Sequence, residues 1–471
     1  MKITSNHYEI ESFLSDASFI RDGYADRLVF PESIEEVSEV LAAANRDRVP
    51  VTISGAGTGT VGGRVPFGGI ILATDKLNRI KEIVREENGG YGTAEAGVIL
   101  SDFQRAVDQQ GLLYPPDPTE RGCFLGGTVA TNASGARTFK YGPTRNYVRR
   151  LKVVLASGEI ADLTRGNGPT IDVQLPSYHM PATRKNASGY FVAPDMDAVD
   201  LFIGSEGTLG VICEVEVKLL PKPEGLLSGV VFFGHEADVL ALVAEARTRV
   251  DARALEFFDR ESLNFLREKY PEIPVNAVGA IFFEQETRAE TEESVLNDWM
   301  ALLDQHHAFA DSWFATNEQD QAKLREFRHQ LPVLMNEWFA RYNQRKVSTD
   351  MAVPDAAFPG LFQLYKETLQ DSGLRYTIFG HIGDNHVHVN ILPRDDSEAA
   401  RARELYVHFL KYAASAGGTL SAEHGVGKLK RDYLRLFYTG DQLREMAALK
   451  RAFDPNGILG RGNILSEELL S

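Results

Sequence analysis

Three histidines and an asparagine lie within ten residues of one another in the stretch YTIFGHIGDNHVHVNIL, residues 376–392. Apolar, β-rich runs flank Gly383, Asp384 and Asn385, a pattern that predicts a strand, a tight turn and a second strand. Alternation along the second strand would place His386, His388 and Asn390 on one face, with His381 facing them across the turn. A metal site or a proton-transfer site can be built from so short a piece of chain.

A second reactive pair, Glu423 and His424, follows in SAEHGVGK, residues 421–428, where glycines bound the loop. Imidazoles and a carboxylate are ligands that Zn²⁺ accepts, and imidazole is also the commonest general base. Taken alone, the histidines also allow a structural zinc site. The remaining sequence has to decide between these interpretations.

The bulk properties limit what the protein can be. At 471 residues, with 43% hydrophobic and 25% charged residues, the chain is expected to form two or three globular domains. A net charge of −16 argues against nucleic acid or anionic membrane as a partner. Two cysteines, Cys123 and Cys213, exclude a disulfide framework and a four-cysteine iron–sulfur site. We find no signal-peptide pattern and no long apolar run, so we expect a cytoplasmic protein, or one peripheral to the membrane, without a transmembrane segment.

A glycine-rich loop, SGAGTGTVGG at residues 54–63, contains a G-x-G-x-x-G pattern at Gly57, Gly59 and Gly62. In a nicotinamide-binding Rossmann fold that pattern opens a helix whose N-terminus holds the pyrophosphate. Here more glycines and Pro66 follow, and residues 70–74 already have the pattern of a strand, so we reject the Rossmann interpretation. A strand–loop–strand phosphate cradle made of backbone N–H groups remains, and so does a flexible surface loop.

The rest of the first half predicts a helix at 31–48, a helix at 100–110 and a hairpin at 148–163. Between them, residues 112–147 are rich in proline, glycine and small hydroxyl residues, which predicts exposed backbone that a large flat ligand can approach. Residues 164–192 are expected to form a loop over the site, and residues 201–220 a glycine turn followed by a strand. Pro221-Lys222-Pro223 is the best candidate for a linker.

From about residue 226, strands and helices alternate, with strands at 230–233, 254–258 and 277–284 and helices at 236–249, 261–268 and 288–307. This order suggests a split βαβ, ferredoxin-like antiparallel sheet. Helices at 320–342 and 354–371 precede the histidine hairpin, and a helix at 397–416 precedes Glu423. A final helix at 441–453 leads into a tail rich in glycine.

Six motifs occur together in one order: SGAGTGTVGGRVP, YPPDP, GGTVATNASGARTFKYGPTR, GSEGTLGVI, the H-x-G-D…H-x-N hairpin and AEHGVGK. In this combination the chain resembles the FAD-linked D-2-hydroxyacid dehydrogenases, of the D-lactate dehydrogenase, glycolate oxidase FAD subunit and D-2-hydroxyglutarate dehydrogenase type, within the vanillyl-alcohol oxidase superfamily. The resemblance covers the chain from about Arg21 to its end.

The resemblance implies an α+β fold in three parts. A two-subdomain FAD-binding domain of the vanillyl-alcohol oxidase type (PCMH type) would span residues 1–222. A ferredoxin-like antiparallel α+β domain for substrate and metal would span residues 223–440. A C-terminal helix and tail, residues 441–471, would pack back on the FAD domain.

The resemblance also assigns FAD-binding residues. The first glycine loop would bind the diphosphate, a second stretch would follow the isoalloxazine and ribityl chain, and a third would hold the adenosine. The three sets are Gly55, Ala56, Gly57, Thr58, Gly59 and Thr60; Pro116, Gly126, Gly127, Thr128, Thr131, Asn132, Ser134 and Gly135; and Glu206, Gly207, Gly210 and Val211. No histidine occurs between His7 and His179, so we expect the FAD to be non-covalent.

For the reaction, the resemblance implies His381, His388 and Glu423 as ligands of a divalent metal, Zn²⁺ first and Mn²⁺ or Fe²⁺ as alternatives. His424 would be the general base that takes the hydroxyl proton of a small anionic D-2-hydroxy acid, while the Cα hydride passes to flavin N5. Arg328, Lys346 and Asn390 match the positions that bind the substrate. The electron acceptor remains unidentified, and a homodimer is compatible with the sequence.

Two departures from the family pattern stand out. Relatives usually have Gly-Asn where this chain has Asn385-His386, so a further imidazole enters the site; it could be a ligand, a hydrogen-bond donor to a ligand, or a side chain that points away. The tail LGRGNIL replaces the usual Asn-Pro-Gly-Lys type of ending. Alternatives to the dehydrogenase are a metal-independent FAD oxidase or ether-lipid-type synthase on the same scaffold, and the flavin subunit of a multi-subunit glycolate oxidase.

Overall fold

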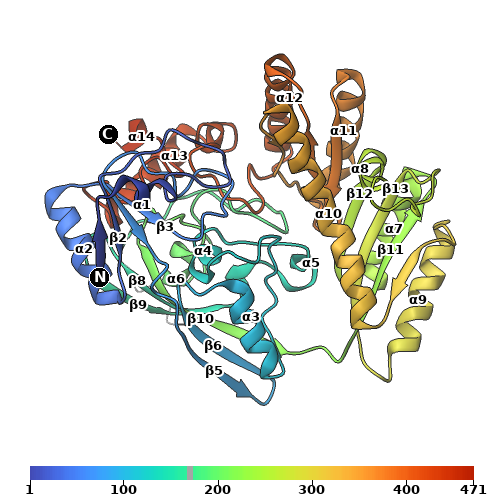
Figure 1. Cartoon of the computed structure of the whole chain (residues 1–471), viewed down its shortest axis with the longest axis horizontal. Coiled ribbons are helices and arrows are strands. Elements are labelled where there is room, and N and C mark those ends of the chain that lie inside the picture. The colour runs from blue at the N-terminus through green and yellow to red at the C-terminus, as the bar shows by residue number, and fades with distance from the viewer. Residues whose placement is uncertain (167–172, 471) are drawn as a thin grey trace.

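A computed structural model describes residues 1–166 and 173–470 (Figure 1). The predicted loop at 164–192 therefore lies partly outside the described residues. The described residues form three β-sheets with helices around them, which confirms the expected α+β class. Figure 1 shows the first two sheets in one half of the molecule and the third, with its helices, in the other.

The first sheet is small and mostly parallel. Its order is β1 (Lys2–Thr4), β2 (Arg27–Phe30), β4 (Ile70–Ala73) and β3 (Val51–Ser54), with β1 alone antiparallel. Helix α1 (His7–Glu11) precedes β2, and helix α2 (Ile34–Asp47), capped by the Ser33 side chain, links β2 to β3. Between β3 and β4 the chain forms no helix. The rejection of a Rossmann motif is therefore confirmed.

The second sheet is antiparallel, in the order β5 (Ile80–Glu86), β6 (Gly89–Glu95), β10 (Val211–Pro221), β8 (Val148–Val154) and β9 (Ile160–Thr164), with β7 (Leu112–Leu113) also paired to β10. Around it lie helices α3 (Leu100–Gln109), α4 (Leu125–Ala130), α5 (Thr138–Tyr141), α6 (Ala198–Phe202) and the 3₁₀ turn η1 (Thr144–Asn146). Helix α4 is a correction, because Leu125 and Val129 are fully buried in a stretch predicted to be exposed backbone.

The third sheet is antiparallel throughout, as the sequence predicts for this half. Its order is β14 (Trp313–Ala315), β11 (Gly225–Phe233), β13 (Gly279–Thr287), β12 (Ala252–Asp259), β16 (Tyr376–Gly380), β17 (His388–Ile391) and β15 (Val347–Ser348). The helices of this half are α7 (Glu236–Arg249), α8 (Arg260–Leu266), α9 (Glu292–Gln305), α10 (Glu318–Tyr342), α11 (Phe358–Ser372) and α12 (Asp396–Ser415), with 3₁₀ turns η2 (Asp355–Ala357) and η3 (Ile382–Asp384).

Alternation along these strands separates two apolar layers. Val231, Ile281 and Leu255 point to a cluster that includes side chains of α7, α9, α11 and α12. Their neighbours Phe232 and Phe282 point to the other face, which α8 and α10 cover. Because both faces are buried, the strands of this sheet are apolar almost without interruption, and polar residues among them need a specific partner.

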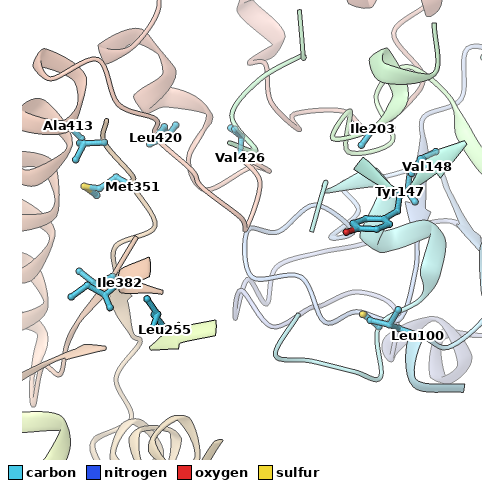
Figure 2. Close-up of a cluster of buried hydrophobic side chains, with 14 of the residues drawn as sticks. Leu100, Tyr147, Val148, Ile203, Leu255, Met351, Ile382, Ala413, Leu420 and Val426 are labelled. Atoms are coloured by element: carbon cyan, nitrogen blue, oxygen red, sulfur yellow. The ribbon is translucent and has the colours of Figure 1, made fainter. Parts of the chain in front are cut away.

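The apolar core is continuous between the two halves of the molecule. The larger cluster contains Tyr147 and Ile203 from the first half as well as Leu255 and Ile382 from the second. Val426, fully buried, lies between these groups in Figure 2. Since Val426 follows His424 by two residues, the loop that carries the Glu-His pair lies where the halves meet.

The C-terminal segment returns to the first half (Figure 1). After η4 (Arg431–Leu436), helix α13 (Gly440–Phe453) and α14 (Glu467–Leu470) complete the chain. Lys450 is almost fully buried and donates hydrogen bonds to the carbonyls of Thr208 and Leu459 as well as to Asp454. Leu459 in turn forms a parallel bridge with Val51 of β3.

The histidine hairpin has a longer turn than predicted. Strand β17 begins at His388, and η3 followed by Asn385, whose φ is 55°, occupies the connection from β16. The prediction that His386, His388 and Asn390 alternate on one strand is thus wrong for His386, which precedes the strand. The 3₁₀ turn η3 and the left-handed Asn385 make the connection longer than a two-residue turn, so His386 falls in the turn and not in the strand.

Asp259, a fully buried residue at the end of β12, fixes the strand that leads to His381. One carboxylate oxygen caps α8 by accepting from the N–H and hydroxyl of Ser262, and it also accepts from the N–H of Ile378 in β16. Burial raises the pKa of Asp259 to about 6. Because the folded-state pKa exceeds the value in the unfolded chain, the contribution of Asp259 to stability is complete below about pH 4 and is lost as the pH rises through 6.

We therefore expect Asp259→Asn, which keeps a capping oxygen and cannot ionise, to gain stability relative to the native chain as the pH rises. Between pH 4.5 and pH 7 the difference in free energy of unfolding should grow by about 2 kcal/mol. All three tryptophans, Trp299, Trp313 and Trp338, lie in this half, so their fluorescence during denaturant unfolding reports on it. Asp298→Asn, at an exposed position of α9, is the control, and a difference that does not change with pH would contradict the assignment.

Candidate active site

His381 follows β16 directly, and its ring is held by Glu256 of the neighbouring strand β12. Its Nδ1 lies 2.6 Å from an oxygen of Glu256, whose other oxygen accepts from Arg328 at 2.8 Å. Burial works to raise the pKa of Glu256, but Arg328 and His381 outweigh it and hold that pKa below its usual value. With Nδ1 donating to this carboxylate, the ring of His381 is fixed and Nε2 faces the site.

His388 is anchored in the same way by a different group. As the first residue of β17, it donates from Nδ1 to the carbonyl oxygen of Thr349, at 2.9 Å. Its Nε2 then lies 3.1 Å from Oε1 of Glu423. The imidazoles of His381 and His388, on one hairpin, thus both direct Nε2 toward the carboxylate of Glu423.

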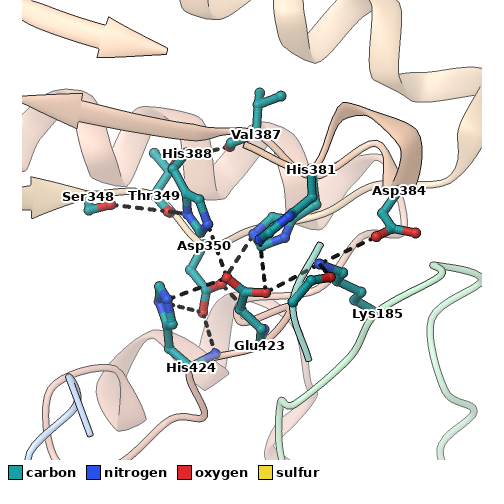
Figure 3. Close-up of polar contacts among 12 residues, drawn as sticks. Lys185, Ser348, Thr349, Asp350, His381, Asp384, Val387, His388, Glu423 and His424 are labelled. Carbon is teal, nitrogen blue, oxygen red and sulfur yellow. Dashed lines mark hydrogen bonds and ion pairs between the residues drawn. The ribbon is translucent and has the colours of Figure 1, made fainter. Parts of the chain in front are cut away.

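Glu423 completes this convergence, as Figure 3 shows. Its Oε2 is 3.3 Å from Nε2 of His381 and 3.2 Å from the ammonium of Lys185, which is fully buried and also 3.3 Å from Asp384. Burial works to raise the pKa of Glu423, but Lys185 and His381 keep it well below the usual range. Two Nε2 atoms and an ionised carboxylate, with both rings held from behind, fit a divalent metal ion.

The proton on His381 sets a condition for metal binding. Burial alone would lower the pKa of His381, but Glu256 and Glu423 raise it to about 9. A metal ion bound at Nε2 would therefore have to displace a proton.

Asp350 organises the loop that carries Glu423 and His424. This buried carboxylate accepts hydrogen bonds from the N–H groups of both residues, at 3.3 and 3.1 Å. It also accepts from the hydroxyl of Ser421 and the ammonium of Lys430, each at 2.5 Å. Burial works to raise the pKa of Asp350, but His424 and Lys430 outweigh it and hold that pKa well below its usual value.

His424 lies between Asp350 and the open part of the site. Its Nδ1 is 3.3 Å from Oδ2 of Asp350 and its Nε2 is 3.6 Å from Glu423, while 28% of its side chain is exposed. The ring is stacked on His388, with centroids 5.4 Å apart. Burial lowers the pKa of His424 to about 4, so the imidazole is neutral at physiological pH and can accept a proton.

A cavity of about 320 Å³ runs from the first glycine loop to this site. Glu423 and His424 line it at one end. Of the residues predicted to bind FAD, those that line it are Gly55, Ala56, Gly57, Thr58, Gly59, Thr60, Gly126, Gly127, Thr128, Thr131, Ser134, Glu206, Gly207 and Gly210. Three stretches far apart in sequence therefore meet around one space of a size typical of ligand sites.

Four residues predicted to contact FAD lie elsewhere. The carbonyl of Pro116 accepts from Gln104, and the carbonyl of Gly135 accepts from Lys185. Asn132 lines a second cavity on the side of Arg145, and Val211 packs in the core beneath the first sheet. Asn132 and Gly135 thus support the walls, since they hold neighbouring loops through hydrogen bonds.

Glu206 joins the cavity wall to the reactive loop. Its two carboxylate oxygens accept the N–H groups of Val426 and Gly427, each at 2.7 Å. A Cβ on Gly425 would come within 2.9 Å of the same carboxylate, so the close approach requires glycine there. Burial raises the pKa of Glu206 to about 7.

The residues predicted to bind substrate are placed differently from one another. Arg328, on α10, is largely buried and paired with Glu256. Asn390 is buried in β17, with its amide 3.5 Å from the carbonyl of His388. Lys346 is exposed to solvent although surrounding protein lowers its pKa by desolvation, against the opposing influence of Asp350 and Glu423.

Sequence reasoning missed Lys185, Asp350 and Glu256. Lys185 lies in the stretch predicted only as a covering loop, and no periodicity distinguishes it. Asp350 stands in the motif KVSTDMAVP, where its burial could not be read from the sequence. Glu256 interrupts an apolar strand, and that interruption was a usable signal, because a carboxylate buried in a two-faced sheet needs a cationic partner.

Comparison with known proteins agrees with this geometry. Residues 25–164 match the family described as "FAD binding domain" and residues 222–464 the family described as "FAD linked oxidases, C-terminal domain". Over 461 residues the chain is 33% identical to D-lactate dehydrogenase from Anaerostipes hadrus, covering 93% of this chain and 89% of the relative. It is 31% identical over 450 residues to glycolate oxidase subunit GlcD of Bacillus subtilis (strain 168), covering 94% and 89%.

A third relative is D-2-hydroxyglutarate dehydrogenase from Xanthomonas citri pv. viticola, 31% identical over 449 residues and covering 93% of this chain and 88% of the relative. Among solved structures, an alkyldihydroxyacetonephosphate synthase matches with a TM-score of 0.70 at 16% identity, covering 97% of this chain and 81% of that chain. That likeness shows a shared fold. Among the residues described, we find no helix that is both long and apolar enough to cross a membrane.

The glycines of the cavity test whether FAD fits. At Gly59 and Gly127, an added Cβ would meet no atom of the described chain within 4 Å, although both residues line the cavity. Neither residue has a positive φ, so conformation alone does not require glycine at these positions. Glycines with free space in front of them and no conformational need are what a ligand lying against the backbone explains.

Gly127→Val should therefore leave the fold intact and reduce the affinity for FAD by about 10- to 100-fold, the effect of about 1–3 kcal/mol of steric overlap. Flavin content and FAD titration of the apoprotein measure this effect, and circular dichroism reports the fold. Gly440→Val, at an exposed position with its nearest contact at 3.5 Å and no positive φ, is the matched control. Equal FAD affinity in Gly127→Val and native protein would show that the cofactor lies elsewhere.

Proposed function

The chain belongs to the family of FAD-linked oxidases, and we propose that it oxidises a D-2-hydroxy acid of the D-lactate or D-2-hydroxyglutarate class to the 2-oxo acid. It is thus an enzyme of the FAD-dependent 2-hydroxyacid dehydrogenase and oxidase type. One observation carries the proposal. The cavity lined by the three glycine-rich stretches ends at Glu423 and His424, and Glu423 is the carboxylate on which His381 and His388 converge.

Each part of the reaction then has a candidate residue. FAD, when bound, supplies the acceptor for the substrate hydride, and a divalent ion held by His381, His388 and Glu423 polarises the hydroxyl. By ligand type we favour Zn²⁺, with Mn²⁺ and Fe²⁺ as alternatives, and we propose non-covalent FAD. The two rings need no rearrangement to serve as ligands, because Glu256 and Thr349 already hold their Nδ1 atoms.

His424 is proposed as the general base. Its Nδ1 faces Asp350, so Nε2 is the nitrogen that can take the hydroxyl proton. The lowered pKa keeps the ring unprotonated before substrate arrives. Asp350 fixes the orientation of the His424 ring and stabilises the imidazolium that forms when the proton is taken, as the carboxylate of a catalytic triad does for its histidine.

The substrate carboxylate needs a cation, and Lys346 is the better placed of the two candidates. In the part of the chain that the structure describes, the ammonium of Lys346 forms no ion pair or hydrogen bond, whereas Arg328 is paired with Glu256. We propose that Lys346 is the main cation for the substrate carboxylate. Arg328 would also interact with that carboxylate while it stays paired with Glu256. Asn390 would direct its amide to the substrate oxygen.

We propose that the chain is divided into three parts. Residues 1–222 would form the FAD domain, residues 223–440 the substrate and metal domain, and residues 441–471 a segment that closes on the FAD domain. Contacts of Lys450 with Thr208 and of Leu459 with Val51 support the last part.

Anaerobic bleaching of the flavin tests the function. Across a panel of D- and L-2-hydroxy acids, we expect at least one D acid to reduce the bound FAD at least about 100-fold faster than its L enantiomer. Removal of the metal by mild chelation should slow reduction by about 100-fold or more, with recovery on adding back Zn²⁺, Mn²⁺ or Fe²⁺. A flavin that no free acid bleaches would favour a subunit that requires a partner chain, and bleaching unaffected by chelation would refute the metal role.

His424→Ala should retain yellow FAD and lose at least about 100-fold in the rate of flavin reduction, the lower range for general-base catalysis. Stopped-flow measurement at saturating acid isolates this step from binding. His408→Ala, at an exposed position of α12, is the control and should reduce flavin at the native rate. A variant at His424 that keeps the native rate would remove this residue from the base role.

A further inference from the structure

His386 lies inside the site although it precedes the strand on which it was expected. The side chain is fully buried, with its ring centroid 4.6 Å from that of His388 and 5.5 Å from that of His381. The backbone N–H of His386 donates a hydrogen bond to the carbonyl of His381, which closes the turn and fixes the backbone position from which the side chain extends. The interpretation in which this imidazole points away from the site is therefore excluded.

Nδ1 of His386 has no hydrogen-bond partner among the residues that the structure describes. Nε2 lies 3.2 Å from an oxygen of Asp350, and this contact helps to lower the pKa of Asp350. A buried ring nitrogen without a partner costs free energy, and buried polar groups nearly always have one. By contrast, His381 and His388 each have Nδ1 anchored and Nε2 aimed at Glu423.

The geometry places His386 among possible ligand atoms. One nitrogen of each of His381, His386 and His388 and one oxygen of Glu423 all lie within 4.8 Å of one another. Atoms bound to one metal ion at about 2.0–2.2 Å must lie within about 4.4 Å of each other. The limit of 4.8 Å exceeds this spacing by only about 0.4 Å, so small adjustments of the side chains would bring all four atoms to a single ion.

We propose that His386 is a fourth protein ligand of the metal held by His381, His388 and Glu423. The proposal rests on the proposed function for the presence of the metal and deepens it by naming the ligand set. It gives each nitrogen of the fully buried ring a partner, since the ion would bind one nitrogen and Asp350, 3.2 Å from Nε2, is available to the other. A role restricted to donating to Asp350 would leave the second nitrogen without any.

The added ligand changes what the site can accept. Three imidazoles and one carboxylate use four positions, and the hydroxyl and carboxylate of a 2-hydroxy acid would bring the total to six. Six ligands are ordinary for Mn²⁺, Fe²⁺ and Co²⁺, whereas Zn²⁺ in proteins mostly takes four or five. With His386 as a fourth protein ligand, the preference for Zn²⁺ that three ligands suggest would shift to a six-coordinate ion while substrate is bound.

The test uses Co²⁺ loaded into the full-length, FAD-containing protein. In His386→Asn we expect the Co²⁺ dissociation constant, measured by competition with a chelator, to rise by about 100-fold or more, with a changed visible spectrum of the ion. Asn is polar, is smaller than the imidazole and keeps a donor for Asp350, so the variant separates ligation from hydrogen bonding. A dissociation constant within about threefold of the native value, with an unchanged spectrum, would overturn the proposal.

Two matched variants frame the result. His388→Asn should lose Co²⁺ at least as strongly, and His408→Asn on the exposed face of α12 should bind it as the native protein does. If His386→Asn fails to fold or to hold FAD, native protein still gives an answer. Paramagnetically shifted ring N–H signals of the Co²⁺ form should number three for three ligating imidazoles, and two would refute ligation by His386.

These readouts do not depend on turnover. If no 2-hydroxy acid bleaches the flavin but His386→Asn loses Co²⁺, the proposed function fails while the ligand assignment stands. If acids bleach the flavin and Co²⁺ affinity is unchanged in the variant, the function stands and the ligand assignment fails.

Discussion

The loop at residues 421–428 is held from two sides by two buried carboxylates, and the geometry of the site depends on this double attachment. Asp350, from the half that contains the third sheet, accepts the N–H groups of Glu423 and His424. Glu206, from the half that contains the cavity, accepts the N–H groups of Val426 and Gly427. Neither half alone can fix the loop, so the reactive side chains take their positions only where the two halves meet.

Buried charge is the cost of this arrangement, and three of the buried carboxylates around the site are paired with a nearby cation. Glu256 is paired with Arg328, Asp350 with Lys430, and Glu423 with Lys185. A buried ion pair contributes little net stability, because desolvation offsets most of the attraction, but removing one partner is strongly destabilising. The pairs are therefore better understood as fixing positions than as holding the fold together, which the apolar core through Val426 does. This division explains how a site so rich in charge can lie inside a protein.

What could be predicted from the sequence followed from local constraints. The glycine loop could be distinguished from a Rossmann motif because the next strand begins too soon for a helix, and helix α7 matched its predicted limits because its period is regular. His386 was misplaced since alternation assumes a tight turn, and η3 with a left-handed Asn385 lengthened it. Lys185 and Asp350 could not be found, because their importance comes from contacts with Glu423, more than seventy residues away in sequence.

The position of Glu423 links cofactor and substrate in one physical unit. The same residue lines the cavity proposed for the flavin and contacts both histidines of the hairpin. It is also paired with Lys185, whose ammonium donates to the carbonyl of Gly135 beside that cavity. A displacement of the flavin stretch would move Lys185, and with it one oxygen of Glu423. Because an imidazole–carboxylate metal site tolerates little error in ligand position, correct assembly around FAD becomes a condition for a correct metal site. The cavity proposed for the flavin and the proposed metal site are thus structurally coupled through a single buried carboxylate.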